Sequence, residues 1–422
     1  MPSFENNSAY GNVFRDSEDD CLLVRPLGSG HSCRAQLVHN YSTGGVCVRK
    51  APRYPTAPNV EGAVESEFDR DVRTAQLLHA AADKANHELR VPKLLSAAYA
   101  PDGSSRASYW DVCNGGTLFA FFDRCRCTGS ALPVGLALHI LLQTLEALDF
   151  MYTGMPEPVY HRDLHESNLV LHFGPGHSVP DVYVIDFGRA VHGRPADDDC
   201  QVNYAGKVLP WWDVPSVLTL ARDHLVPLTL THDKRRRLQA AGRSTAAYIY
   251  LIQKDRHNNN RGHPLRRAYQ MLRALDREFA TRLAGVPQGE PRSRKDGGVS
   301  ATVTPPSLRP VIKFLRGVVG THLLDVGLDD KHEAFRSAVL HPTRDRARAV
   351  MGMRPRLCCS VARLLEWVEE TGVPGPWDVA EVDAEDPGLA VKRVMPKQWG
   401  GGRKVESWER DDEDEDDEEE MW

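Results

Sequence analysis

Two short polar segments near the middle of the chain contain residue types that can move a proton and hold a metal ion. Residues 161–168 read His-Arg-Asp-Leu-His-Glu-Ser-Asn, and residues 186–188 read Asp-Phe-Gly. Each segment lies beside an apolar run with the composition of a strand, at 169–171 and 182–185. A carboxylate can accept the proton of a nucleophile, while a second carboxylate and an amide can hold Mg²⁺ against phosphate groups. Phosphoryl transfer needs residues of these types.

The order and spacing of these segments resemble the protein kinase superfamily, in which an H-R-D-x-x-x-x-N loop and a D-F-G motif act on MgATP. The resemblance implies that Asp163 is the catalytic base and that Asn168 and Asp186 are Mg²⁺ ligands. It also implies ATP and Mg²⁺ as cofactors. The remaining motif residues take structural roles, and these are His161, Arg162, Phe187 and Gly188.

A glycine-bearing turn and a lysine upstream match the nucleotide-binding part of the same family. Gly28, Ser29 and Gly30 follow a strand-like run, and their backbone N–H groups could approach phosphate oxygens. Lys50 ends the run that begins at Val46 and would neutralise the α- and β-phosphates during catalysis. Cys33 occupies the position of the family's third glycine, and Arg49 competes with Lys50 for the lysine's role.

The run at 110–118 resembles the segment that joins the two kinase lobes, where backbone groups bind adenine. Cys113 would make these backbone contacts, and the bulky Trp110 would close the pocket behind the base. Three apolar residues would sandwich adenine, although each could equally be an ordinary core residue. They are Ala35, Val48 and Val170.

Two further acidic residues have structural roles in the resemblance. Asp71 lies where the family has the helix glutamate that pairs with the lysine, and Glu67, one turn earlier on the same helix face, is the alternative. Asp213, in a Trp-Asp-Val-Pro-Ser run, would anchor the H-R-D loop by hydrogen bonds to its backbone.

The elements expected to position these residues form a two-lobed α+β, protein-kinase-like fold. Alternating apolar residues at 22–27, 36–38 and 46–50 predict antiparallel strands, and helical spacing predicts a helix over 61–85. The run at 136–152 is apolar around most of a helix surface, which is typical of a buried helix. The predicted divisions are a polar extension at 1–20, a β-rich first lobe at 21–113, a mainly helical second lobe at 114–370, a C-terminal extension at 371–408 and an acidic, disordered tail at 409–422.

Charge is distributed unevenly in the second half of the chain. Residues 225–316 contain nineteen Lys and Arg against six Asp and Glu, and residues 409–420 contain eleven acids and one arginine. We expect the first segment to be a basic insert that could contact a polyanion, with a mobile linker at about 285–310. The acidic tail could cover this insert.

The composition also predicts a cellular setting. No run approaches the roughly 20 apolar residues that a membrane-spanning helix needs. The nine cysteines show no second pair at zinc-ligand spacing, so we expect reduced thiols in an intracellular protein, cytoplasmic or nuclear.

The acceptor of the phosphoryl group stays open. No Ala-Pro-Glu follows Gly188 before Asp213, and His165 stands where serine/threonine kinases have a lysine that touches the γ-phosphate, so a protonated His165 could take over this contact. A kinase acting on Ser or Thr of a protein fits the glycine turn, the joining segment and Asp213. A small-molecule kinase of the aminoglycoside or choline kinase type fits His165, and an ATP-binding pseudokinase scaffold fits Cys33 and the uncertain helix carboxylate.

Overall fold

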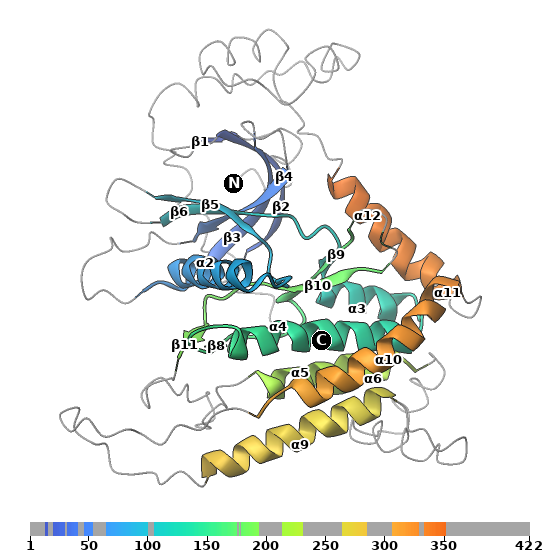
Figure 1. The fold of residues 1–422 in the computed structure, drawn as a ribbon. Helices are drawn as coiled ribbons and strands as arrows, with labels where there is room; N and C mark the ends of the chain where they lie inside the picture. The colour runs from blue at the N-terminus through green and yellow to red at the C-terminus, as the bar shows by residue number, and fades with distance from the viewer. Residues whose placement is uncertain are drawn as a thin grey trace, which may run out of the picture. The chain divides into compact units, whose positions relative to one another are not determined.

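The computed structural model divides the chain into two units (Figure 1). The first unit takes in residues up to Phe68 and Leu94–Val112, and the second takes in Asp69–Lys93 and Cys113–Val350. Gly30, the acidic tail, the C-terminal extension and most of the basic insert lie outside the described residues. The structure describes residues 13–15, 20–29, 32–40, 46–53, 65–99, 105–174, 177, 179–193, 213–230, 264–284, 306–328 and 333–351.

The first unit contains a six-stranded antiparallel sheet in the order β1-β2-β3-β4-β6-β5. The three strands predicted from alternating apolar residues lie within β2, β3 and β4. Irregular register in β2 lies around Pro26, which has no N–H to donate to a ladder. A small core forms from Val38, Cys47, Ala98, Ala107 and Tyr109. The strands are β1 (Val13–Arg15), β2 (Asp20–Ser29), β3 (Cys33–Asn40), β4 (Val46–Pro52), β5 (Leu94–Tyr99) and β6 (Ser105–Trp110).

Helix α2 (Glu67–Ala85) belongs to the second unit from Asp69 onward, although the sequence assigned it to the first lobe. Leu78 and Ala82 of α2 lie in the large core of the second unit, which explains this division. The predicted helix was too long at its start, because residues 65 and 66 are not helical. It ends at Ala85, and the next residue, Asn86, has a φ of 49°, a left-handed conformation that asparagine tolerates better than most residues.

Helix α4 (Val134–Thr153) forms the centre of the second unit and is buried along nearly its whole length. Of the helices in the described part of the chain, it alone is long and apolar enough to span a membrane by length and composition, and 78% of its apolar window is buried inside the unit. The prediction that no run comes near this length was wrong for length and composition alone, since this mostly buried helix gives no clear membrane span. Its apolar character is explained by its packing against α10 (Arg309–Leu328) and β10 (Asp181–Val184).

Three short helices and two small sheets complete the frame around the polar motifs. The H-R-D loop joins β8 to β9, and the D-F-G residues join β10 to β11. Asn114 extends the β10-β9-β7 sheet, because its side-chain amide exchanges two hydrogen bonds with the backbone of Phe173. The elements are β7 (Gly116–Thr117), α3 (Leu118–Cys127), β8 (Val159–Tyr160), β9 (Leu169–His172), β11 (Val191–His192), α5 (Val214–Leu220) and α6 (Val226–Leu228).

Two helices of the second unit widen into a π turn just before a proline. The π turn η2 (Ala221–Leu225) precedes Pro227, and η4 (Arg336–Leu340) precedes Pro342 with the same spacing. Proline cannot donate a backbone hydrogen bond, and its ring collides with the carbonyl four residues earlier, so the preceding turn opens to an i to i−5 bond. Helices α11 (Glu333–Phe335) and α12 (His341–Met351) flank η4.

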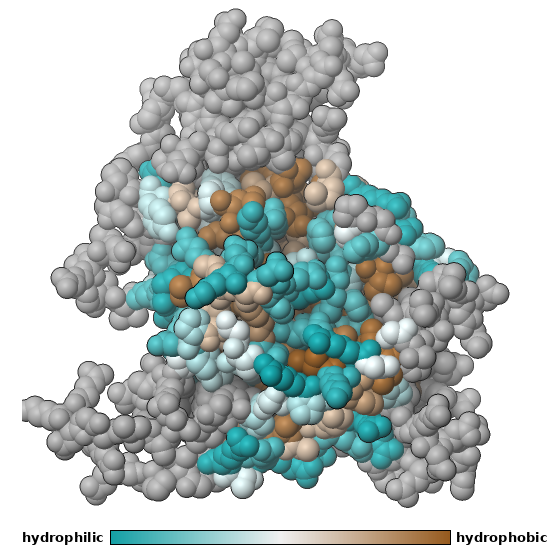
Figure 2. All heavy atoms as spheres, viewed as in Figure 1, coloured by the Kyte–Doolittle hydropathy of each residue, from teal (hydrophilic) through white to brown (hydrophobic). Residues whose placement is uncertain are grey.

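Most of the described part of the basic insert is helical. Helix α9 (Pro264–Ala284) packs against α4, α5 and α10, and Figure 2 shows hydrophilic residues with hydrophobic ones among them at its place. Arg267, Arg273 and Arg277 are exposed on α9. Most of the predicted linker lies outside the described residues, and α10 begins near its predicted end, at Arg309, where the Ser307 hydroxyl accepts the first free N–H of the helix.

We expect His139 on α4 to make stability depend on pH. Burial lowers the pKa of His139, whose Nε2 donates to the carbonyl of Pro180 (3.1 Å). The hydrogen bond and the charges of Asp181 and Glu146 oppose this shift, while Arg90 adds to it. The unfolded chain then binds a proton below about pH 6.5, where the folded chain does not. The free energy of unfolding should fall as the pH drops below that point, by up to about 1.4 kcal/mol per pH unit.

The matched control is His139→Gln, which can keep the donor to Pro180 but does not titrate. Urea unfolding at a series of pH values gives the slope of the unfolding free energy against pH. For the variant this slope should correspond to up to one bound proton fewer than for the wild type. Equal slopes for the two proteins would show that His139 does not cause the loss of stability at low pH.

Candidate active site

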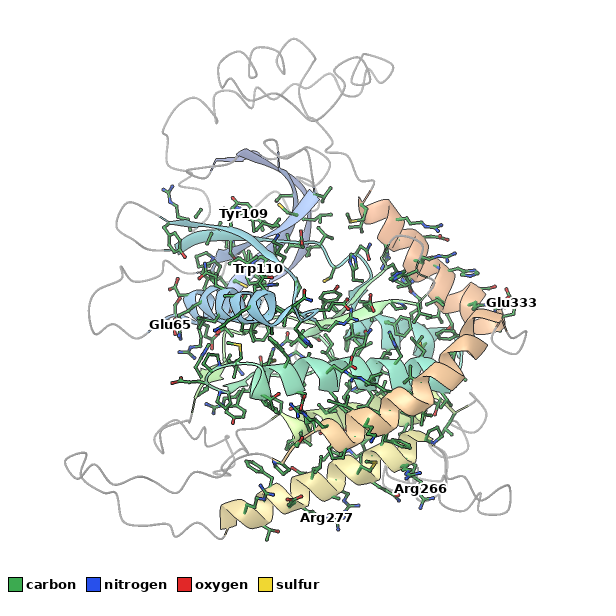
Figure 3. The ribbon with its side chains drawn as sticks, viewed as in Figure 1. Glu65, Tyr109, Trp110, Arg266, Arg277 and Glu333 are labelled. Carbon is green, nitrogen blue, oxygen red and sulfur yellow. The ribbon has the colours of Figure 1, made fainter. Side chains whose placement is uncertain are left out.

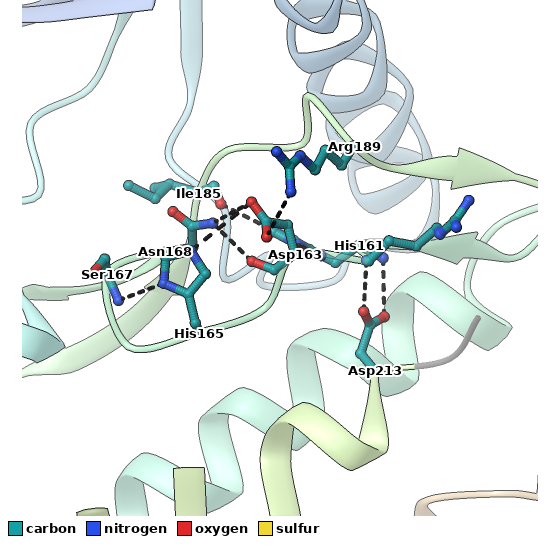
Figure 4. A network of polar contacts seen from close by, with 9 residues as sticks. His161, Asp163, His165, Ser167, Asn168, Ile185, Arg189 and Asp213 are labelled. Atoms are coloured by element: carbon teal, nitrogen blue, oxygen red, sulfur yellow. Dashed lines mark hydrogen bonds and ion pairs between the residues drawn. The ribbon is translucent and has the colours of Figure 1, made fainter. Parts of the chain in front are cut away.

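Asp213 anchors the H-R-D loop from its position just before α5. Its Oδ1 accepts from the backbone N–H of Arg162 (2.7 Å), and its Oδ2 accepts from the N–H of His161 (3.0 Å) (Figure 4). The same Oδ2 also accepts from the hydroxyl of Tyr152 (3.0 Å). The Tyr152 hydroxyl in turn accepts from the N–H of Asp213 (2.9 Å). Burial raises the pKa of Asp213, against the opposing effects of His161 and these hydrogen bonds. Burial, together with Asp213, raises the pKa of Tyr152 well above its ordinary value.

His161 connects the H-R-D loop to the residue before the D-F-G motif. Its Nδ1 accepts from the N–H of Asp163 (3.3 Å), so the proton of the neutral ring is on Nε2, which donates to the carbonyl of Ile185 (2.9 Å). The fully buried ring also contacts Phe187, with 5.0 Å between ring centroids. The two motifs are therefore held together by an imidazole with a defined tautomer.

Asn168 makes the second connection between the two motifs. Its side-chain nitrogen donates to the backbone carbonyl of Asp163 (2.8 Å), and its backbone carbonyl accepts from the N–H of Ile185 (3.0 Å). Its side-chain oxygen accepts no hydrogen bond from any residue that the structure describes. The predicted metal ligands Asn168 and Asp186 thus belong to two segments that are hydrogen-bonded to each other.

Asp186 has a left-handed backbone conformation and a carboxylate that no described residue binds. Its φ of 68° is unfavourable for a residue with a Cβ, and its carboxylate makes no hydrogen bond or ion pair with any described residue. Among these residues, no group of three or more His, Cys, Asp or Glu side chains could hold a metal ion. The carboxylate of Asp186 and the amide oxygen of Asn168 fit Mg²⁺, whose remaining ligands are commonly phosphate oxygens and water.

Asp163 is half-buried and has three polar neighbours. The side-chain nitrogen of Asn168 lies 3.5 Å from Oδ2, and His165 Nε2 lies 3.9 Å from the same oxygen. Arg189 Nη1 lies 3.6 Å from Oδ1. His165 is exposed, and its Nδ1 accepts from the N–H of Ser167 (3.2 Å). The predicted base therefore lies between two basic side chains.

Helix α2 holds the D-F-G segment from another side. Asp71 accepts from the N–H of Phe187 (2.7 Å), and Arg70 Nη1 donates to the carbonyl of Gly188 (3.3 Å). One turn later, the hydroxyl of Thr74 lies 2.8 Å from Nε2 of His192. The buried carboxylate of Asp71 thus binds the backbone of the D-F-G segment. The pairing of Lys50 with Asp71, or with its alternative Glu67, stays a prediction.

The far end of the H-R-D loop contacts α3 and the π turn η2. The carbonyl of Glu166 accepts from the N–H of Phe119 (3.0 Å), and its Oε1 lies 3.6 Å from His224 Nε2. Arg126 lies 2.6 Å from His224 Nδ1, and since arginine can only donate, the proton of the neutral ring is on Nε2. Burial lowers the pKa of His224, and Arg126 acts in the same direction against Glu166 and Asp223.

The sheet of the first unit brings several predicted nucleotide-binding residues onto one face. Gly28 pairs with Ala35, and Ala35 pairs with Lys50 on the next strand. Directly opposed residues share a face, as do residues two apart along a strand, so Val48 lies on this face too. The Lys50 ammonium lies 4.9 Å from the centre of the Trp110 ring, at the end of β6 (Figure 3). Ser29, which pairs with Arg34, is the next residue along β2.

The competing residue Arg49 lies on the opposite face of the same sheet. There it donates to the side chain of Gln36 (3.3 Å). Val170 and Cys113 belong to the second unit. Val170 is buried on β9, opposite Thr117 of β7, and the segment after Cys113 is tied to β9 by the N–H of Gly115, which donates to Leu171 (2.8 Å).

Four contributors to this site were missed by the sequence reasoning. For three of them the sequence held a signal. Tyr152 lies in a helix that is apolar all round, so its hydroxyl needs a partner, and Arg70 and Thr74 are polar residues four apart, which lie on one helix face. No local pattern marks the fourth residue, which simply follows the D-F-G glycine. The missed residues are Tyr152, Arg70, Thr74 and Arg189.

We predict that Asp213→Ala lowers the free energy of unfolding by about 2–5 kcal/mol, because two buried backbone N–H groups and a tyrosine hydroxyl lose their acceptor. Urea unfolding measures this change. Asp213→Asn keeps the shape and one acceptor oxygen, so its loss should be smaller. Tyr152→Phe should cost about 1 kcal/mol. An alanine variant as stable as the wild type would show that the loop does not depend on Asp213.

No family model matches the chain. A stretch of 66 residues, 16% of the chain, is 36% identical to the Wall-associated receptor kinase-like 14 of Arabidopsis thaliana and spans 9% of that protein. The crystal structure of the BubR1 kinase domain is similar over 80% of this chain and 88% of that chain, with a TM-score of 0.48 and 10% identity. The sheet unit, the helical unit and the anchored H-R-D and D-F-G segments agree with the α+β, protein-kinase-like fold predicted from the sequence.

Proposed function

We propose that the chain is an ATP-dependent phosphotransferase, most consistent with a protein kinase that transfers the γ-phosphate of MgATP to Ser or Thr of a protein. One observation carries this proposal. Ile185 donates its N–H to Asn168 and accepts from His161, so Asp163, Asn168 and Asp186 belong to two segments that are hydrogen-bonded to each other. A proton acceptor and two oxygen ligands on one frame are what phosphoryl transfer requires.

Asp163 would act on the acceptor hydroxyl. The hydroxyl oxygen forms a bond to the γ-phosphorus, its proton passes to the Asp163 carboxylate, and the bond from the γ-phosphorus to the β–γ bridging oxygen breaks with its electron pair to leave ADP. Asn168 and Asp186 would hold Mg²⁺, which neutralises phosphate charge when bound. The hydrogen bond from Asn168 to the carbonyl of Asp163 keeps the base beside these ligands.

The first unit would supply the nucleotide contacts. Lys50, Ala35 and Val48 share one face of the sheet with Gly28, an arrangement that supports a phosphate contact for Lys50 and apolar contacts for adenine. Ser29 and Gly30 would complete the phosphate turn. In the second unit, Val170 and the backbone of Cys113 would contact the base.

The exposed arginines of α9 support a weaker, separate proposal, a contact of the basic insert with a polyanion. Arg267, Arg273 and Arg277 are exposed on one helix whose described residues carry more arginines than acids. Such a contact would depend steeply on salt, because it rests on charge alone.

We expect Asp163→Asn to lower the rate of phosphoryl transfer by about 10²- to 10⁴-fold, the usual effect of losing a general base. Binding of MgATP should be retained, because Asp163 is not a metal ligand in this scheme. Transfer from labelled ATP to general protein acceptors measures the rate. Asp345→Asn, an exposed residue on α12 paired with Arg348, serves as the control. Turnover of Asp163→Asn at the wild-type level would contradict the assignment.

Asp186→Asn should instead weaken binding of MgATP itself, by about tenfold or more, since a direct ligand is lost. Titration calorimetry with ATP in the presence of Mg²⁺ and of a chelator separates metal-dependent from metal-independent binding. Mg²⁺ without nucleotide should bind weakly, because the described residues offer no cluster of three ligating side chains. Unchanged MgATP affinity in Asp186→Asn would exclude it as a ligand.

Panels of acceptors decide between the classes of enzyme. Transfer to aminoglycosides, choline or sugars but not to protein would identify a small-molecule kinase. Mg²⁺-dependent stabilisation by ATP without any transfer would identify a pseudokinase scaffold.

A further inference from the structure

The predicted base Asp163 has a different basic side chain near each of its two carboxylate oxygens (Figure 4). His165 Nε2 lies 3.9 Å from Oδ2, and Arg189 Nη1 lies 3.6 Å from Oδ1. The sequence places His165 where a lysine would touch the γ-phosphate. The structure adds a second candidate for that contact from the residue after the D-F-G glycine.

The two side chains differ in how constant their charge is. A histidine is charged only when protonated, whereas an arginine keeps its charge at physiological pH. In the neutral ring, His165 can donate from Nε2 only, because its Nδ1 accepts from the N–H of Ser167 (3.2 Å). Arg189 offers a planar fork of donors, which matches two oxygens of a phosphoryl group at once.

The backbone of Arg189 is held by the same contacts that hold the D-F-G motif. The N–H of Phe187 is bound to Asp71 (2.7 Å), the carbonyl of Gly188 to Arg70 (3.3 Å), and the N–H of Ala190 to the carbonyl of Phe187 (2.9 Å). These bonds enclose Arg189 in a tight turn. The backbone position of Arg189 is therefore set by the same hydrogen bonds that hold the segment of Asp186.

The reaction geometry brings the transferred group within reach of this guanidinium. An acceptor oxygen must lie within about 3 Å of the base, and the phosphorus within about 3–3.5 Å of that oxygen. The phosphoryl group then lies within about 6–7 Å of the Asp163 carboxylate. Arg189 already lies 3.6 Å from that carboxylate.

We propose that Arg189 is a further catalytic residue, which contacts the transferred phosphoryl group and supplies the constant positive charge that the sequence had assigned to His165. The inference rests on the proposed function. Its chemistry is that of an arginine provided by the same chain, which stabilises the negative charge of the phosphoryl group during transfer.

The test compares Arg189→Ala, Arg189→Lys and His165→Gln, each checked by thermal unfolding. Arg189→Ala should lower kcat with MgATP by about 10²- to 10³-fold. It should also reduce the preference for ATP over ADP, measured by calorimetry, by about tenfold, because the contact is to the γ-phosphate. Arg189→Lys should recover part of kcat through its charge. His165→Gln should lose less than about tenfold, since glutamine keeps one donor.

Arg316→Ala is the matched control, because Arg316 is an exposed arginine in an ion pair with Glu146 (2.7 Å), and its removal should change neither quantity. A loss of kcat confined to His165→Gln, or an increase of kcat in Arg189→Ala, would overturn the proposal.

A wild-type protein that binds ATP but transfers no phosphate would refute the proposed function alone. The ratio of ATP to ADP affinity in Arg189→Ala would then still decide the role of Arg189, and an unchanged ratio would refute it. A wild-type protein that binds neither nucleotide would refute both.

Discussion

The buried carboxylate of Asp213 is the interaction on which the geometry of the H-R-D loop depends. Removing a charge from water costs several kcal/mol, so this site is stable only because protein donors replace the water. Two of the donors are the consecutive N–H groups of His161 and Arg162. Adjacent N–H groups can reach one carboxylate only where the chain turns sharply, and Arg162 has a φ of 63°. The carboxylate thus stabilises a turn that is unfavourable by itself, and this turn directs the loop that carries Asp163.

The D-F-G segment depends on this loop and on helix α2 at the same time. Toward the loop, Ile185 is bonded through both its N–H and its carbonyl. Toward α2, Phe187 and Gly188 are bonded to Asp71 and Arg70. Asp186 lies between these two sets of bonds, which explains how a non-glycine residue keeps a φ of 68°. Strain at this position is maintained by its neighbours, and the Asp186 side chain contributes no bond of its own among the described residues.

Proline has an indirect role in the surroundings of the loop. Pro227 widens the preceding turn into η2, and this turn carries His224. The ring of His224 stacks on Phe122, with 5.3 Å between centroids, and lies between Arg126 and Glu166. A backbone property of one residue thereby places a titratable ring beside the far end of the H-R-D loop.

The sequence by itself determined the two motifs, their order, the three strands around the glycine turn and the central helix, because motif spacing and hydrophobic periodicity are local properties of the chain. Only the tertiary structure decided which groups the motifs bind. The partners Asp71 and Phe187 are 116 residues apart, and no periodicity connects such distant positions. Alternation along β4 alone puts Arg49 and Lys50 on opposite faces, but which of the two shares a face with Gly28 and Ala35 depends on strand register, which is defined by pairing with neighbouring strands. The contact between Arg189 and Asp163 was invisible in the sequence, because it arises where two loops are brought together by hydrogen bonds to a third residue, Ile185.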